Sequence, residues 1–126
     1  MLVAVLALIV AVAVAGSVLF ATQTLPPLRA TYDFTDDLHR GRTADAFARV
    51  CDDLRTPSQR DRFAAFAALI RAADSVSVDF LSVRRDGDHA TVEFDVRTSR
   101  TQSHTIKLRL VNERGDWRPC GADPVD

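Results

Sequence analysis

Hydrophobic residues follow three different patterns along this chain of 126 residues. Residues 2–21 form a continuous apolar run without a charged side chain. Between residues 28 and 70, apolar residues recur at the spacing of amphipathic helices. From Ser75 onward they alternate with polar residues, which is the spacing of half-buried β-strands. The pattern therefore predicts an apolar N-terminal helix followed by one α+β domain.

The apolar run at the N-terminus has the length of a transmembrane helix. From Leu2 to Ala21 it would form a helix of about 30 Å, which matches the hydrocarbon thickness of a bilayer. We expect residues 1–22 to be a transmembrane anchor or an uncleaved signal, followed by a linker at 23–27. Secretion after signal cleavage is the alternative, because Ala11-Val12-Ala13 and Ala13-Val14-Ala15 have the small-x-small pattern of cleavage sites.

Three short helices are predicted before the first strand. Pro26-Pro27 suits the start of the first helix, which Gly41 would end. Thr43 is the expected N-cap of a second helix that carries Cys51. Thr56-Pro57 begins the third, with Thr at the N-cap and Pro at the first helical position. The apolar faces of these helices contain the following residues: Leu28, Tyr32, Phe34, Leu38, Ala46, Phe47, Val50, Leu54, Phe63, Phe66, Ala67 and Ile70.

The two central strands alternate strictly, and the alternation predicts how they pair. A loop centred on Thr101 places Phe94 opposite Leu108, with both side chains on the apolar face. The same register sets apolar residues against apolar residues and acidic residues against basic residues. Its other pairs are Val96–Ile106, Val92–Leu110, Asp95–Lys107 and Glu93–Arg109.

The first hairpin needs an irregularity in its first strand. Asp86-Gly87 predicts a two-residue turn. Continued without a change, the register of that turn would set the charged Asp79 against Phe94. A β-bulge at Phe80-Leu81 removes this conflict and predicts a bend in the sheet. The resulting pairs are Val83–Ala90, Leu81–Val92, Val78–Phe94 and Val76–Val96.

The last strand is predicted after a turn at residues 112–116, where Gly115 can take a positive φ angle. This strand carries Trp117 and also Pro119, which has no N–H to donate and therefore belongs at a sheet edge. We expect a bent antiparallel sheet of four strands under three short helices. The domain would span residues 28–121, with a tail at 122–126.

Size and charge limit the functions that the domain can have. The part beyond the apolar run has about 100 residues, which is the size of one domain. The formal net charge is -1, and the longest blocks of like charge are pairs such as Arg84-Arg85. Nucleic-acid binding is not expected, because it needs a concentrated basic face.

Cys51 and Cys120 are the two cysteines of the chain. In an exported domain, an even count and a wide separation favour a disulfide, whereas two reduced thiols would be expected in a cytosolic protein. Closing so long a loop would stabilise the domain by about 4 kcal/mol. No basic residue precedes Arg29, so the positive-inside rule does not support an external domain. That orientation depends on the cysteine pair.

Two stretches of the domain have a recognisable combination of residues: Tyr32, Leu38, Gly41, Ala46, Phe47 and Cys51, and later Gly115-Asp116-Trp117-Arg118-Pro119-Cys120. These stretches resemble small actinobacterial membrane-anchored or secreted proteins with a nuclear transport factor-like fold, also called a cystatin-like α+β cone. The resemblance covers roughly Leu28 to Cys120 and implies the cone fold and an extracytoplasmic disulfide. It does not imply an activity, since most such proteins have none assigned.

Side chains for proton transfer are present, but they do not form a motif. The candidates are Tyr32, Asp33, Asp79, Asp95 and His104. Asp79 and Asp95 fall on the outer face of the predicted sheet. His104 shares the register of Ile106 and would face into the cone, or form a hydrogen-bonded histidine at the rim. We therefore predict no catalytic, cofactor-binding or metal-binding residue and keep Tyr32 and His104 as candidate pocket residues.

These observations favour a non-enzymatic domain held at the cell membrane by its N-terminal helix and lying outside the cytoplasm. It would bind another envelope protein, or form a homodimer, through the outer face of its sheet. The alternative is a small-molecule-binding protein, or an isomerase or hydrolase of the same fold, that uses the region of His104 and Tyr32. An enzyme predicts an open cavity with facing polar groups, whereas a scaffold predicts a filled cone and a charge-paired outer face.

Overall fold

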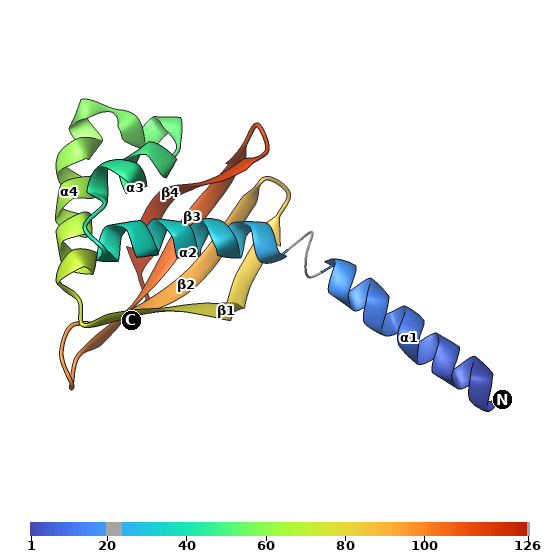
Figure 1. Cartoon of the computed structure of the whole chain (residues 1–126). Coiled ribbons are helices and arrows are strands. Elements are labelled where there is room, and N and C mark those ends of the chain that lie inside the picture. The colour runs from blue at the N-terminus through green and yellow to red at the C-terminus, as the bar shows by residue number, and fades with distance from the viewer. Residues whose placement is uncertain (20–23, 126) are drawn as a thin grey trace.

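The computed structural model describes residues 1–19 and 24–125. It is an α+β structure whose four-stranded antiparallel sheet has the strand order β1-β2-β3-β4 (Figure 1). The elements, in chain order, are α1 (Leu2–Leu19), α2 (Leu25–His39), α3 (Thr43–Arg49), the 3-10 helix η2 (Asp52–Arg55), α4 (Pro57–Ala72), β1 (Ser75–Asp86), β2 (His89–Arg97), β3 (Ser103–Glu113) and β4 (Asp116–Pro124).

The prediction of a transmembrane helix at the N-terminus is wrong. Among the described residues, no helix combines the length and the hydropathy that a membrane crossing requires. α1 has 18 residues, which correspond to about 27 Å of helix against the roughly 30 Å of a bilayer core. The end of the expected span, at Ala21, and the beginning of the expected linker lie outside the described residues.

The helices of the domain begin and end close to the predicted positions. α2 begins at Leu25, earlier than the expected Leu28, and Pro26-Pro27 therefore lies in its first turn. Gly41 follows α2 with a φ of 79°, a conformation that glycine adopts without strain. α3 ends at Arg49, so Cys51 lies just beyond the helix and not on it.

α4 starts as the sequence predicts. Thr56 occupies the N-cap position and a proline, Pro57, lies in the first turn. Between α3 and α4, the chain forms the 3-10 helix η2, which the sequence analysis did not predict. This short turn brings the chain from the end of α3 to the start of α4.

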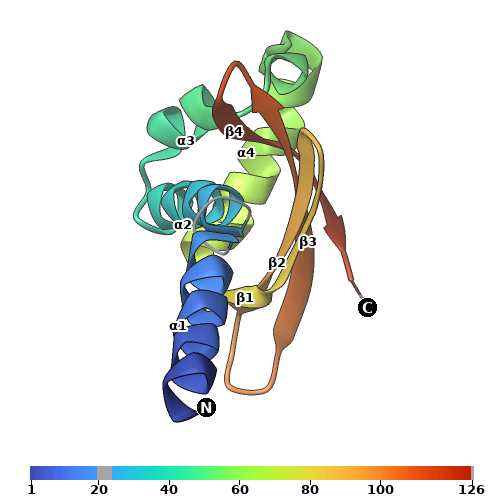
Figure 2. The same cartoon turned by 90° about the vertical axis from the view of Figure 1, so that its right-hand side faces the viewer.

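The helices α2, α3 and α4 form one layer against one face of the sheet, and no described element covers the other face (Figure 2). The core lies between the two layers. Phe34 and Leu38 of α2 meet Val92 and Phe94 of β2 and Leu108 of β3, and these five residues are at most 2% exposed. Hydrophobic burial of these facing side chains holds the layers together.

The predicted register of β2 and β3 is wrong by two residues, although every side chain is on the predicted face. Phe94 lies opposite Ile106 instead of Leu108. The loop is closed by the Thr98 N–H, which donates to the Gln102 carbonyl at 3.1 Å, so the loop is centred on Arg100 and not on Thr101. A shift of two residues keeps the alternation intact, and alternation alone therefore does not distinguish the two registers. The expected pairs Asp95–Lys107 and Glu93–Arg109 become Asp95–Thr105 and Glu93–Lys107.

The irregularity in β1 is confirmed, and so are the pairs Val78–Phe94 and Val76–Val96 beyond it. It is longer than one residue, because the register changes between Asp79 and Arg84. The expected pair Val83–Ala90 is wrong, since Arg85 lies opposite Ala90. Figure 1 shows β1 bending sharply along its length.

The Ser82 hydroxyl replaces the missing backbone pairing within the irregular part of β1. It donates to the Asp79 carbonyl at 2.6 Å and accepts the Glu93 N–H at 2.8 Å. The neighbouring Phe80 and Leu81 are 53% and 72% exposed. This bulge disrupts the free edge of β1, an arrangement that discourages edge-to-edge aggregation.

β3 and β4 form a hairpin whose turn residues, Arg114 and Gly115, have φ angles of 56° and 91°. β4 is an edge strand, as Pro119 predicts. The strand extends to Pro124, so most of the expected tail at 122–126 pairs with β3. Cys120 lies at a register shift between Pro119, which pairs with Leu110, and Gly121, which pairs with Arg109.

Candidate functional site

The disulfide between Cys51 and Cys120 is present, as predicted. The two Cα atoms are 5.2 Å apart. The backbone N–H of Cys51 also donates to the carbonyl of Pro119 at 2.9 Å. Together these links hold the segment between α3 and η2 against the edge strand β4.

Beside the disulfide, a cleft of about 400 Å³ opens between α4, η2 and the strands β3 and β4. We call it the phenylalanine cleft, after Phe34, Phe63 and Phe66. The Phe34 ring lies 6.2 Å from that of Phe63 and 6.3 Å from that of Phe66, measured between centroids. An apolar floor and a volume in this range are typical of small-molecule sites. The other lining residues are Val50, Leu54, Gln59, Arg62, Leu108, Arg109, Pro119, Cys120, Gly121, Ala122 and Asp123.

The polar groups of the phenylalanine cleft are not equivalent. Arg109 Nε lies 2.9 Å from Asp123 Oδ2, so the carboxylate in this cleft is already paired. Gly121 leaves room for the guanidinium of Arg109, because a Cβ at this position would overlap it. Arg62 forms no ion pair among the described residues. The cleft therefore offers an apolar floor, an unpaired cation at Arg62 and the amide of Gln59.

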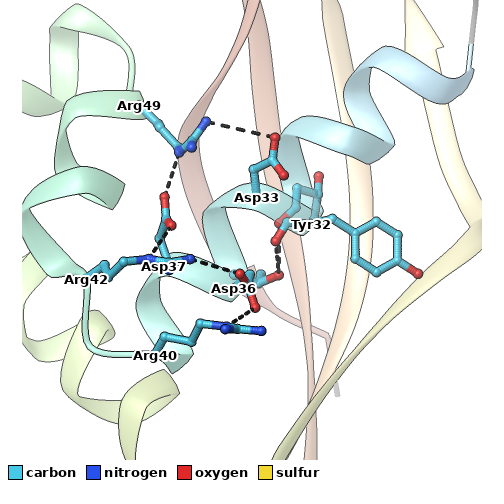
Figure 3. A network of polar contacts seen from close by, with 9 residues as sticks. Tyr32, Asp33, Asp36, Asp37, Arg40, Arg42 and Arg49 are labelled. Atoms are coloured by element: carbon cyan, nitrogen blue, oxygen red, sulfur yellow. Dashed lines mark hydrogen bonds and ion pairs between the residues drawn. The ribbon is translucent and has the colours of Figure 1, made fainter.

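Aspartates of α2 form an ion-pair network with arginines of α3 and of the loop between α2 and α3 (Figure 3). Asp37 lies at the centre of this network, because its side chain is 7% exposed and each of its carboxylate oxygens is bound by an arginine. Arg42 Nε donates to one oxygen at 3.0 Å and Arg49 Nε to the other at 2.7 Å. Asp36 binds Arg40 and Arg42 at the surface. These charge-assisted hydrogen bonds fix α3 against α2.

The network borders a second cleft, of about 570 Å³, between the first half of α2, α3 and the β3–β4 hairpin. We call it the tryptophan cleft, after Trp117. Arg49 and Asp33 both line it, and their side chains lie 4.0 Å apart. The guanidinium of Arg85 lies 4.9 Å from the centroid of the Trp117 ring, a cation–π contact. The other lining residues are Leu25, Pro26, Arg29, Ala30, Ala48, Gly115, Asp116, Arg118 and Pro119.

The two candidate pocket residues from the sequence do not line either cleft. Tyr32 is 48% exposed, and its ring points away from the ion-pair network (Figure 3). His104 is exposed at the start of β3, where it lies opposite Val96. A pocket formed by Tyr32 and His104 stays a prediction.

The other candidates are also dispersed. Asp33 lines the tryptophan cleft, while Asp79 and Asp95 are exposed on strands. Asp95 accepts a hydrogen bond of 2.6 Å from the Thr105 hydroxyl, which occupies one of its oxygens. Among residues 1–19 and 24–125, no cluster of three or more His, Cys, Asp or Glu side chains is suited to a metal ion.

The sequence analysis did not identify Arg62 or Trp117 as site residues. A signal for Arg62 was present, since it stands four residues before Phe66 on the same face of α4. A cation beside an aromatic stripe marks the rim of an apolar surface. Trp117 offered no such signal, because the other walls of the tryptophan cleft come from α2 and α3, which are distant in the sequence.

Comparison with known proteins supports the fold by structure alone. No family model matches the chain, and neither does any curated protein. A crystal structure from Campylobacter jejuni, named as a suggested NTF2-like transpeptidase, matches with a TM-score of 0.54 and 14% identity over 71% of this chain and 92% of that one. A SEC-C motif-containing protein from Rhodopseudomonas palustris matches with a TM-score of 0.51 and 20% identity over 72% of each chain. The fold is NTF2-like.

NTF2-like is the fold that the resemblance in the sequence implies, and this part of the expectation is confirmed. At these identities the likeness concerns the fold and not the activity. Function in an NTF2-like domain has to be argued from its own clefts.

Proposed function

We propose that this chain is a non-enzymatic binding domain that works outside the cytoplasm. The disulfide supports the location, because disulfides persist in oxidising compartments and are rare in the cytosol. Cys51 and Cys120 join the helical layer to an edge strand across 69 residues of sequence, as expected for a structural bond in a small exported domain.

The phenylalanine cleft carries the proposal that the domain binds a ligand. Its floor is aromatic, and Arg62 supplies a cation without a partner among the described residues. A ligand with an apolar body and one anionic group would match both features. The apolar body would displace water from the phenylalanine rings, and the anion would bind the guanidinium.

Among the described lining residues of the phenylalanine cleft, the carboxylate is already paired, which favours binding over catalysis there. Proton transfer needs a positioned acid or base within hydrogen-bond reach of the substrate. Asp123, the carboxylate in the phenylalanine cleft, is engaged by Arg109 at 2.9 Å. An isomerase or hydrolase that uses Tyr32 and His104 is the competing candidate, and both of these side chains are exposed outside the clefts.

A protein-binding role for the outer face of the sheet is a second candidate function. This face is not covered by a described element, and it contains paired polar groups such as Glu93 opposite Lys107. A paired, solvated face favours an adaptable polar contact with an envelope protein or a second copy over a permanent apolar interface.

Binding in the phenylalanine cleft is tested with 8-anilinonaphthalene-1-sulfonate, a fluorescent probe that has an aromatic body and one sulfonate. We expect saturable binding that dodecanoate displaces. Arg62→Gln should weaken it about fivefold to tenfold, the value of one charge-assisted hydrogen bond. Arg60→Gln is the matched control, because Arg60 lies on the same helix outside the cleft. Equal affinities of these two variants would overturn the ligand site.

The location is tested by thiol labelling of the protein in intact cells that produce it. A maleimide reagent of high mass should shift the protein only after denaturation and reduction, because Cys51 and Cys120 are bonded. Labelling without reduction would contradict an oxidising compartment. The purified protein, assayed with ester and ketosteroid substrates, should give no turnover above the buffer. Turnover lost in His104→Ala would favour the enzyme instead.

A further inference from the structure

The tryptophan cleft offers two cationic side chains, whereas the phenylalanine cleft offers one, Arg62, because its Arg109 is paired with Asp123. Arg29 of α2 and Arg118 of β4 line it from different elements. Arg29 forms no ion pair among the described residues. Arg118 lies 3.9 Å from Glu113 and 3.7 Å from Asp116, distances longer than a direct hydrogen bond. Nη1 of Arg118 also donates to the Ala48 carbonyl at 3.4 Å, so Arg29 has all of its donors available for an external anion and Arg118 has part of them.

The remaining arginine in this cleft has a different role. Arg49 donates to the buried Asp37 at 2.7 Å and lies 4.0 Å from Asp33, so its guanidinium is already engaged by carboxylates of α2. It stabilises the wall that α3 contributes to the cleft. The recognition of an external group therefore rests on Arg29 and Arg118.

The cleft also has an apolar side. Trp117 is half-buried there, and Pro26 and Pro119 lie in the same lining. Arg85 contacts the Trp117 ring at 4.9 Å and restrains it. Tryptophan and arginine are the residue types that dominate binding energy at protein interfaces, since each combines a large contact area with a directional polar group.

We propose that the tryptophan cleft binds an extended acidic segment of a partner protein. A carboxylate of the segment would bind between Arg29 and Arg118, and an adjacent apolar side chain would pack on Trp117. Guanidinium donors match a carboxylate in geometry as well as in charge. The site shares Pro119 with the lining of the phenylalanine cleft and has its own cationic side chains, and it adds a macromolecular partner to the proposed ligand binding.

Fluorescence anisotropy with a labelled peptide of alternating Glu and Leu residues tests this site on the full chain. We expect binding that a Gln and Leu peptide of the same length does not reproduce. Arg29→Gln and Arg118→Gln should each weaken it about fivefold to tenfold. Arg29→Gln is the decisive variant, because Arg29 is exposed and forms no ion pair that folding would lose. Arg100→Gln is the control, since Arg100 is exposed in the β2–β3 loop and outside the cleft.

Two results would overturn the inference: equal binding of the acidic and the amide peptide, or full affinity in Arg29→Gln. Failure of this site and failure of the proposed ligand binding are distinguishable. Arg62→Gln should leave peptide binding unchanged, and Arg29→Gln should leave the affinity for 8-anilinonaphthalene-1-sulfonate unchanged. Peptide binding that is weakened equally by Arg62→Gln would assign the peptide to the phenylalanine cleft and contradict the tryptophan cleft.

Discussion

The two clefts of this domain depend on different interactions. The phenylalanine cleft is an extension of the core, since Phe34 is both part of its floor and 2% exposed. A covalent bond, Cys51–Cys120, forms one of its borders. The tryptophan cleft is shaped by ion pairs, with Asp37 holding Arg49 at its wall. Packing and a disulfide therefore maintain one cleft, whereas charge maintains the other.

Removing the disulfide should have the largest effect on this comparison. In the double variant Cys51→Ala and Cys120→Ala, the free energy of unfolding should fall by about 4 kcal/mol, because the unfolded chain regains the entropy of a long loop. Urea denaturation measures it, and the wild type in reductant is the control. The phenylalanine cleft should lose more affinity for its probe than the tryptophan cleft loses for its peptide. A loss of stability below about 1 kcal/mol would contradict this role of the bond.

Neutralising Asp37 should have the next largest effect, and this effect concerns the tryptophan cleft. Asp37→Asn removes the charge that binds Arg42 and Arg49, and we expect a loss of about 2 kcal/mol of stability. Asp36→Asn is the matched control, because Asp36 is half-exposed and its ion pairs contribute about 0.5 kcal/mol. Thermal unfolding of both variants measures the difference. Equal effects would show that burial of Asp37 does not matter.

Changing the floor of the phenylalanine cleft should have a smaller effect on stability. Phe63→Leu keeps an apolar side chain at a half-buried position but removes the ring contact to Phe34. We therefore expect the free energy of unfolding to fall by about 1 kcal/mol. The affinity for 8-anilinonaphthalene-1-sulfonate should fall, and peptide binding should not change. Leu69→Ala, at an exposed position of the same helix, serves as the control.

Ionic strength should give the smallest change and should separate the clefts without a mutation. Raising sodium chloride from about 0.05 to 0.5 M should weaken peptide binding roughly threefold more than probe binding, because salt screens exposed charges but not apolar contacts. Titrations of both ligands at each salt concentration measure the ratio. Identical salt dependence in the two titrations would remove the distinction between the clefts.

Part of the site was predictable from the sequence, because the signals for it lie in the composition and in the spacing of nearby residues. Cysteine number and spacing identified the pair Cys51 and Cys120, and the alternation in β2 and β3 assigned each side chain to a face. Arg62 and Phe66 could have been connected by their helical spacing. Arg29 and Arg118 could not be connected, because nothing in the spacing of two residues so far apart predicts that α2 and β4 share a cleft.

By itself, the sequence determined the order of helices and strands, the inward and outward faces, the disulfide and the position of Pro119 at a sheet edge. These features follow from local periodicity, capping residues and the missing N–H of proline. Only the tertiary structure decided the register of Phe94 against Ile106, the length of the bulge at Phe80 and the two clefts. Registers that differ by two residues have the same faces, so the choice between them depends on turns and packing across the whole domain.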